Sequence, residues 1–388
     1  MCYAVPVMLH FLACGTHPSL SLAEAKAVLG LDPVFLVENI AVYDTENWDG
    51  SALMEQLGGT IKLGDVIADL PQKDMAADRL ADMIDERPRA NRVLYGLTIK
   101  GSERNKHKNL PIQLKKALKE RGRSARWVTG DQGDLTPAAV AKCHLTDEGY
   151  DFTIALAKNR ALVCLTTNVQ DADAWSKRDF GRPFRDATTG MLPPKVARMM
   201  VNLAATHHTI LDPFCGAGTV LMEAALLKTG KLIGSDLDTR QIEGARVNLD
   251  WLVQAGLIDE ATRTNIDLHV QAAETIDKRL ASSSIDAIVT EGFLGKPLQG
   301  DETVSWLKRQ QHEIEELWIA TLKASAKILK PSGRVICVWP TFIARDGSVS
   351  VDVSQELANL GYNKIGPTLE YGRPEQHVKR GIVVLEKL

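Results

Sequence analysis

Hydrophobic and polar positions follow two different patterns along the chain, and the pattern changes near residue 170. In the first part, short apolar runs alternate with helical periodicity at irregular intervals. Residues 149–171 are typical of two strands joined by a turn at Lys158 and Asn159. This mixture predicts a small α+β assembly of two subdomains.

The same patterns predict the individual elements of this first part. The apolar start of the chain, residues 1–15, predicts a buried first strand. Residues 18–30 predict a helix with Ser21 as its N-cap, Glu24 three residues later and Gly30 as its stop. The other helices expected are 50–59, 75–87 and 110–122, and the other strands are 33–44 and 92–100.

After residue 190 the alternation becomes regular. Residues 193–205 predict a helix with two prolines at its start, where a missing N–H costs nothing. Strands are then expected at 209–214, 231–236, 266–272, 284–291 and 333–340, and helices at 218–230, 239–256 and 305–329. Such alternation is typical of a largely parallel, doubly wound sheet, so we expect an α/β fold in this part.

A polar connector rich in glycine, proline and charge separates the two parts. We therefore place the main domain boundary there. The segments expected are an α+β region over 1–95, a second α+β region over 96–170, a linker over 171–190 and the α/β domain over 191–388.

The composition is that of an ordinary globular protein, with 45% hydrophobic and 24% charged residues. A formal net charge of −3 argues against a chain that coats nucleic acid along its whole length. The six cysteines form no CxxC pair and no ligand spacing with histidine, so we expect reduced thiols and no metal. The apolar start lacks a positive region and is too short to span a bilayer, so we expect a cytoplasmic protein without a membrane segment.

The stretch ILDPFCGAGTVLMEA, residues 210–224, carries the strongest chemical signal. A strand ends at Asp212, a tight loop contains Gly216 and Gly218, and a helix follows. Glycines there let the backbone approach a ligand, and the helix start offers unpaired N–H groups. The third glycine of a dinucleotide motif is missing, which favours a nucleoside ligand. Asp236 at the next strand tip can take both hydroxyls of a ribose. Two turns with solvated acids are the alternative.

This combination resembles the class I S-adenosylmethionine-dependent methyltransferases, whose first motif is matched by DPFCGAGT. The resemblance implies S-adenosylmethionine as cofactor, with the loop holding its methionine part and the strand-end acid its ribose. Where that family places an acid against the adenine amine, this chain has alanines, with Glu274 as the acid nearby. The cofactor-binding residues implied are Asp212, Pro213, Cys215, Gly216, Gly218, Asp236, Leu237, Ala273 and Glu274.

In the amino-methylating branch of that family, the fourth strand ends in an Asp/Asn-Pro-Pro-aromatic motif, which holds an exocyclic amine and stacks on its base. This chain has TEGF there, residues 290–293. One alignment puts Glu291 at the acid position, and the other puts Thr290 there with Phe293 as the stacking ring. Gly292 stands where a proline stood, and we expect a more flexible loop. Glu291 is thus an acceptor for the substrate amine, a structural loop acid, or part of an altered site.

A second resemblance covers most of the chain. SKRDFGRPFRDATTGMLPPKVARMMVNLA followed by ILDPFCGAGT is similar to the tRNA (guanine-10-N2)-methyltransferase family. This implies a ferredoxin-like region over 1–95, a THUMP-like RNA-binding region over 96–170 and a methyltransferase domain over 191–388. It also implies tRNA as substrate and leaves open a small activating protein subunit. Methylation of another nucleic acid such as rRNA, and an RNA-binding protein with a degenerate methyltransferase domain, remain alternatives.

A basic segment agrees with an RNA partner. Residues 100–126 hold ten Lys or Arg against two Glu, an excess typical of a surface that follows phosphates. A solvated helix face is the alternative. The RNA-binding residues expected here and in the connector are Lys106, Lys108, Lys115, Lys116, Arg121, Arg123, Arg126, Lys177, Arg178 and Arg182.

Overall fold

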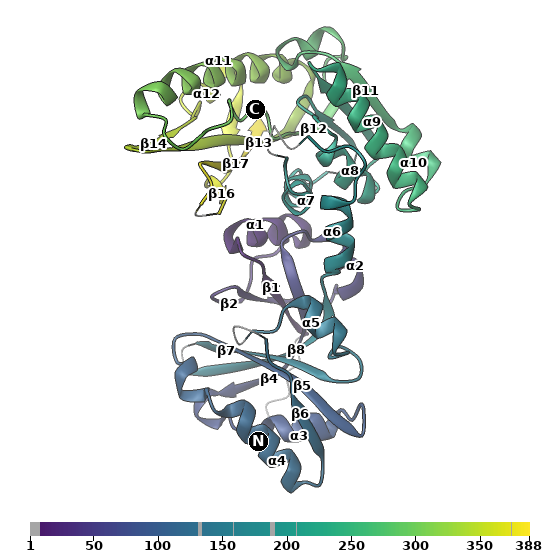
Figure 1. Ribbon diagram of the computed structural model, residues 1–388, viewed down its shortest axis with the longest axis vertical. Coiled ribbons are helices and arrows are strands. Elements are labelled where there is room, and N and C mark those ends of the chain that lie inside the picture. The colour runs from purple at the N-terminus through teal and green to yellow at the C-terminus, as the bar shows by residue number, and fades with distance from the viewer. Residues whose placement is uncertain (1–7, 131–133, 158, 187–190, 207, 374) are drawn as a thin grey trace. The chain divides into compact units, whose positions relative to one another are not determined.

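The computed structural model describes residues 8–130, 134–157, 159–186, 191–206, 208–373 and 375–388 (Figure 1). The chain divides into two compact units. The amino-terminal unit comprises Met1–Leu22 and Gly30–Ala174, and the carboxyl-terminal unit comprises Ala23–Leu29 and Trp175–Leu388. The division falls inside the stretch predicted as a linker.

The amino-terminal unit is built on one eight-stranded sheet with the order β2-β3-β1-β4-β8-β7-β5-β6. Its strands are β1 Leu9–Cys14, β2 Phe35–Val37, β3 Ile40–Asp44, β4 Thr60–Pro71, β5 Arg92–Lys100, β6 Ser124–Trp127, β7 Tyr150–Ala157 and β8 Arg160–Val169. Only β5 pairs in parallel, with β6 and β7, whereas the other described pairs are antiparallel. The predicted pair of strands around residue 158 is confirmed as β7 and β8.

Helices cover this sheet because their apolar residues recur on one face. Its α-helices are α2 Gly50–Gln56, α3 Ala77–Glu86, α4 Leu110–Glu120 and α5 Pro137–Lys142, and its 3₁₀ turns are Gln72–Asp74 and Arg104–His107. Helix α1 Pro18–Leu29 is divided between the two units after Leu22. Helix α3 buries Leu80 and Ile84, and α4 buries Leu114 and Leu118, in one core with Phe152 of β7. The α+β prediction for this part is confirmed.

The predicted N-cap of the first helix is wrong. Helix α1 already begins at Pro18, where the proline's missing N–H costs nothing. Ser21 therefore lies inside the helix and is buried, and its hydroxyl donates to the carbonyls of His17 and Gly59. The predicted stop is confirmed, since Gly30 follows the helix with a φ of 70°.

The carboxyl-terminal unit is built on a nine-stranded sheet with the core order β11-β10-β9-β12-β13-β17-β15, to which β14 and β16 are added. Its strands are β9 Thr209–Asp212, β10 Lys231–Asp236, β11 Ile266–Val270, β12 Ile285–Val289, β13 Leu329–Ala344, β14 Gly347–Ser350, β15 Tyr362–Lys364, β16 Leu369–Tyr371 and β17 Val378–Lys387. The pairs among β9 to β13 are parallel, as predicted. The antiparallel strands β14 to β17 were not predicted.

Helices alternate with these strands. They are α6 Ala172–Phe180, α7 Pro194–Leu203, α8 Thr219–Leu226, α9 Thr239–Gln254, α10 Glu260–Thr264, α11 Val304–Ile328 and α12 Leu357–Leu360, with a 3₁₀ segment at Ala273–Lys278. Local signals fix their starts: Pro194 is the first residue of α7, Asp238 caps α9, and Thr303 caps α11. Among the described residues, none of these or the earlier helices combines the length and apolar character that a membrane crossing needs.

The described part of the predicted linker, residues 171–186, contains a helix that packs on its neighbours. Helix α6 forms there, and its Arg178 is buried and pairs with Glu223 of α8 at 2.9 Å. Arg198 of α7 pairs with the other oxygen of Glu223 at 2.7 Å, and the Arg178 guanidinium lies 4.0 Å from the centre of the Trp175 ring. One buried carboxylate therefore joins three helices of this unit.

Candidate active site

The carboxyl ends of β9 and β10 bring the predicted loop and the predicted strand-end acid together. Strand β9 ends at Asp212, and α8 begins at Thr219. Gly216 and Gly218 have φ values of 49° and 83°, which glycine adopts without strain. The Gly216 N–H donates to Oδ2 of Asp236 at 2.9 Å, and the Asp238 N–H donates to Oδ1 at 2.9 Å. The carboxylate thus fixes both its own turn and the glycine loop.

The surroundings of Asp236 offer an apolar surface beside the acid. Leu237 is 75% exposed, which is unusual for a leucine that directly follows a buried strand. Ala273 is buried and Glu274 is exposed. Ala273 has no carboxylate that could bind an adenine amine, and the Glu274 side chain is exposed to solvent.

Inside the loop, Asp212 and Cys215 are buried. Burial raises the pKa of the Asp212 carboxyl to about 7, while the Phe214 N–H, which donates to it at 3.2 Å, opposes this. Burial also raises the pKa of the Cys215 thiol well above its ordinary value. A protonated, buried thiol is a poor nucleophile, so Cys215 serves as a packing residue of the loop.

The end of β12 places the TEGF residues next to this loop. Thr290 is fully buried, and Phe293 is 47% exposed. The Glu291 side chain is 17% exposed, and its Oε1 accepts a hydrogen bond from Nε of Arg380 on β17. Within the described part of the chain, Oε2 of Glu291 has no recorded partner. Burial raises the pKa of the Glu291 carboxyl, and the Arg380 guanidinium partly opposes this.

The prediction of a flexible loop at Gly292 is wrong. Gly292 has a φ of 75°, and a Cβ there would lie 2.4 Å from Cζ2 of Trp318. The Trp318 ring also packs against the Phe214 ring of the glycine loop, with 5.8 Å between centroids. Gly295 has a φ of 88°, and a Cβ there would lie 2.4 Å from Nε2 of Gln310. These glycines are required by a positive φ and by close packing, so the loop is held against α11.

In the amino-terminal unit, acids of α3 partly neutralise the predicted basic surface. Arg121 pairs with Asp82 at 2.8 Å and with Asp85 at 3.0 Å, and Arg123 pairs with Asp85 at 3.0 Å. Lys106 and Lys116 have local partners in Glu103 and Glu120. Lys108, Lys115, Lys119 and Arg126 are exposed without a recorded ion pair. The surface is therefore basic, but less so than the sequence count of residues 100–126.

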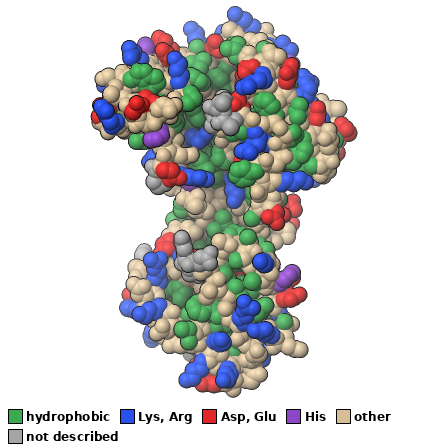
Figure 2. Space-filling view, viewed as in Figure 1, with side chains coloured by type: hydrophobic (Ala, Val, Ile, Leu, Met, Phe, Trp, Pro, Cys, Tyr) green, Lys and Arg blue, Asp and Glu red, His purple; other side chains and the backbone are tan. Residues whose placement is uncertain are grey.

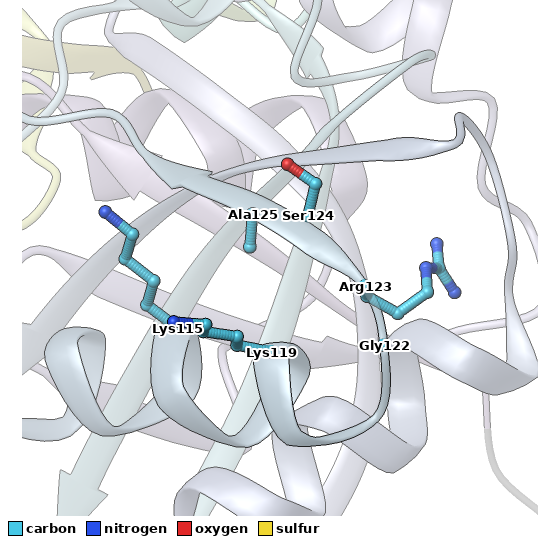
Figure 3. Close-up of a pocket in the computed structure, with 6 residues that line it drawn as sticks. All are labelled: Lys115, Lys119, Gly122, Arg123, Ser124 and Ala125. Carbon is cyan, nitrogen blue, oxygen red and sulfur yellow. The ribbon is translucent and has the colours of Figure 1, made fainter.

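Helix α4 and strand β6 frame an open groove of about 410 Å³ (Figure 3). Lys115 and Lys119 lie on neighbouring turns of α4, and the Arg123 side chain points away from them. Ser124 and Ala125 of β6 form the other side. Figure 2 shows Lys and Arg side chains distributed over the face of the amino-terminal unit, among apolar ones.

The predicted RNA contacts in the connector need correction. Arg178 and Arg182 are 9% and 3% exposed. Arg178 pairs with Glu223, and Nη1 of Arg182 donates to the Thr219 hydroxyl at 2.6 Å. Neither guanidinium lies on the surface where a phosphate backbone could reach it. Lys177 is exposed and remains available for such a contact.

Two residues of the site were missed by sequence reasoning. Arg380 lies 89 residues after its partner Glu291, and Trp318 lies in the middle of a long helix. The positions of these two residues in the sequence give no sign that they belong to the site. A metal site was not expected, and the one group of potential ligands in the described ranges, His144, Asp147 and Glu148, is solvent-exposed. The five described cysteines are free thiols, as predicted.

Comparison with known sequence families points to the same kind of fold. Residues 182–341 match the family model of UPF0020, described as an RMKL-like methyltransferase domain. The carboxyl-terminal unit has the Rossmann-like fold that such a domain requires. Over the whole chain, the crystal structure of TrmN from Thermus thermophilus is similar in fold, with a TM-score of 0.54 and 18% identity over 98% of this chain and 100% of that one.

Named relatives are similar over part of the chain. The tRNA (guanine(10)-N2)-dimethyltransferase of Methanocaldococcus jannaschii is 29% identical over 53% of this chain and 54% of that protein. The U6 snRNA (guanine-N(2))-methyltransferase THUMPD2 of Bos taurus is 30% identical over 33% of this chain and 24% of that protein. The chain thus spans about half the length of the curated relatives it matches, or less. The predicted Rossmann-like fold and the predicted family resemblance are confirmed.

Proposed function

We propose that the protein is an S-adenosylmethionine-dependent RNA methyltransferase that acts on the N2 amine of a guanine in tRNA. One observation carries the proposal: the Trp318 ring packs against both Phe214 of the glycine loop and the Gly292 turn, so the turn that contains Glu291 is held next to that loop. The named relatives that methylate guanine N2 support this choice of amine.

The residues of the domain fit S-adenosylmethionine. Gly216 and Gly218 leave open backbone where side chains would stand, Asp236 offers its carboxylate at the strand tip, and Leu237 offers an exposed apolar surface. When bound, this cofactor supplies a methyl group on a positively charged sulfur. The Cys215 N–H donates to the Ser235 carbonyl at 2.9 Å and its carbonyl accepts from the Gly218 N–H at 2.8 Å, which shapes the loop. Pro213 joins this loop to the buried Asp212.

The TEGF residues receive the base. Oε2 of Glu291 accepts a hydrogen bond from the exocyclic amine, while Arg380 on Oε1 favours the charged carboxylate. The exposed face of Phe293 stacks on the base, and buried Thr290 and Gly292 fix the turn. An amine aimed in this way gains most of its rate from position, and ideal positioning is worth up to about 7–11 kcal/mol.

The amino-terminal unit binds the phosphate backbone of structured RNA through exposed basic side chains, among them Lys108, Lys115 and Arg126. We place its ferredoxin-like part at 1–95 and its THUMP-like part at 96–170. The family resemblance points to position 10 of a cytoplasmic tRNA, with a small activating subunit as a further partner.

Transfer of labelled methyl groups from S-adenosylmethionine to unmodified tRNA transcripts tests this function. The label should appear in N2-methylguanosine when the product nucleosides are separated by mass spectrometry. Label in another nucleoside would contradict the choice of amine. A protein that binds the cofactor and the tRNA but transfers no label would be an RNA binder with a degenerate domain.

A further inference from the structure

In the part of the chain that the structure describes, Arg182 is a buried arginine without a carboxylate partner. It is 3% exposed, and its recorded contacts are the Thr219 hydroxyl at 2.6 Å and the Met191 sulfur at 3.9 Å. Its Nε is buried with no hydrogen-bond partner among the described residues. Neighbouring Arg178 and Arg198 differ sharply, because both are paired with Glu223.

An uncompensated buried charge is costly, so its presence calls for a reason. Burial lowers the pKa of the Arg182 guanidinium to about 10, and Asp179 and Glu223 oppose this only from beyond ion-pair distance. A guanidinium in this state has lost its hydration and gained no anion. It is therefore poised for an anionic group that the folded chain itself does not supply.

The position of Arg182 is set by the segment that contains it. Residues 182–186 are tied to the glycine loop and to the helix starts beside it. Arg182 bonds Thr219 at the first residue of α8, and Asn248 joins both Phe184 backbone groups to the carbonyl of Ala217. Further on, the Gln241 amide donates to Asp186 at 2.8 Å. Arg182 thus stands at the start of α8, where free helix N–H groups also favour an anion.

The acids around the glycine loop make Arg182 the favourable partner for the carboxylate of the cofactor. Asp212, Asp236 and Glu291 are acids at the carboxyl ends of the strands, and the charges of the latter two add to the burial that raises the pKa of Asp212. The carboxylate is the one anionic group of S-adenosylmethionine. An anion placed among three acids would be repelled, whereas one placed at Arg182 would complete a buried ion pair.

We propose that Arg182 binds the carboxylate of the amino acid end of the cofactor, with its Nε and the start of α8 as donors. This rests on the proposed function, because it takes S-adenosylmethionine as the ligand. Arg182 is then a ligand-binding residue and not part of the RNA surface. It also gives the connector a role, since residues 182–186 complete the cofactor site.

Calorimetric binding of S-adenosylhomocysteine and of its decarboxylated analogue to wild type and Arg182→Gln tests the proposal. The substitution should weaken S-adenosylhomocysteine by about 10- to 100-fold, the usual loss for a hydrogen bond to a charged group. It should leave the decarboxylated analogue unchanged. Lys177→Gln, an exposed change on α6, which ends just before Arg182, should affect neither ligand. Equal weakening of both ligands, or no weakening of either, would overturn the proposal.

Thermal unfolding without ligand separates this role from a structural one. Arg182→Gln should leave the melting temperature unchanged or raise it, because it removes an unpaired buried charge. Arg198→Gln should lower it, because it leaves Glu223 with one partner. A large loss of stability in Arg182→Gln would mean that the arginine supports the fold instead. If wild type bound neither ligand, the proposed function itself would fail, which is a different result from binding that Arg182 does not affect.

Discussion

The Trp318 ring occupies the space that a side chain at Gly292 would need. A Cβ at Gly292 would lie 2.4 Å from Cζ2 of Trp318, and the residue has a φ of 75°. The same ring packs on Phe214, so the TEGF turn and the glycine loop share one rigid support. Their relative position, on which aiming an amine depends, is thus fixed by a residue in the middle of α11.

Gly292→Ala should therefore reduce methyl transfer while cofactor binding stays intact. Gly256 supplies a matched control, since it has a φ of 66° and nothing within 4 Å of the position of its Cβ. Both changes should lower the free energy of unfolding by about 1–2 kcal/mol, because alanine disfavours a left-handed backbone. Only Gly292→Ala must also displace the Trp318 ring. Turnover and the binding of S-adenosylhomocysteine would be measured for both. Equal turnover in the two variants would show that the Trp318 contact does not matter.

The carboxylate of Glu291 should be required for turnover. Glu291→Gln keeps the shape but loses the charge, and we expect turnover to fall by about 100-fold or more with cofactor binding unchanged. Because the pKa of Glu291 is raised, wild-type activity should fall on acidification already above the ordinary glutamate range near pH 4.3. This acidic limb should be absent from the residual activity of the variant. An unchanged pH profile would mean that another group titrates.

Asp212 should make the protein less stable as the pH rises. Its pKa of about 7 in the folded protein exceeds the ordinary value of about 3.9, so the folded state binds the extra proton between these values. Stability is then lost from about pH 4 to about pH 7. Asp212→Asn should raise the melting temperature relative to wild type more at pH 8 than at pH 5. A difference that does not change with pH would contradict the assignment.

Glu223 should be essential to the fold. Glu223→Gln leaves Arg178 and Arg198 buried with weakened partners, and breaking a buried pair costs about 3–5 kcal/mol. Asp267→Asn breaks an exposed pair with Lys231 and should cost at most about 1 kcal/mol. Urea unfolding of both variants measures the two costs. Similar costs would refute the view that Glu223 anchors three helices.

The basic groove should carry more of the RNA affinity than the paired arginines do. Lys115→Gln with Lys119→Gln removes charges that have no recorded ion pair, and should lower the salt slope of tRNA binding by about 2. Arg121→Gln with Arg123→Gln removes charges already paired with Asp82 and Asp85, and should lower it less. Binding would be titrated over a range of salt concentrations. The opposite ranking would place the RNA on the other side of α4.

The sequence predicted the parallel core of the carboxyl-terminal unit well because each strand and helix there has a local signal. Asp236 and Gly216 were also brought together as expected, since the carboxyl ends of neighbouring parallel strands share an edge. The antiparallel strands β14 to β17 lack such signals, being short or joined only to distant partners. Arg380, which holds Glu291, lies on one of them.

Other errors arose from charges counted along the chain without their partners in space. The basic residues of 100–126 appeared unopposed because the acids of α3 lie more than thirty residues earlier in the sequence. The sequence alone predicts surface charges at Arg178 and Arg182 because nothing local shows that α6 and the residues after it pack on α8. It predicts a flexible Gly292 because only the fold reveals the ring beside it.

The central claim is that Glu291 holds the amine that receives the methyl group. Single-turnover methylation of one tRNA transcript by wild type and by Glu291→Gln, at saturating cofactor, tests it most directly. We predict N2-methylguanosine from wild type and almost none from the variant, with equal binding of S-adenosylhomocysteine and of tRNA. Equal rates of N2-methylguanosine formation by the two proteins would contradict the claim.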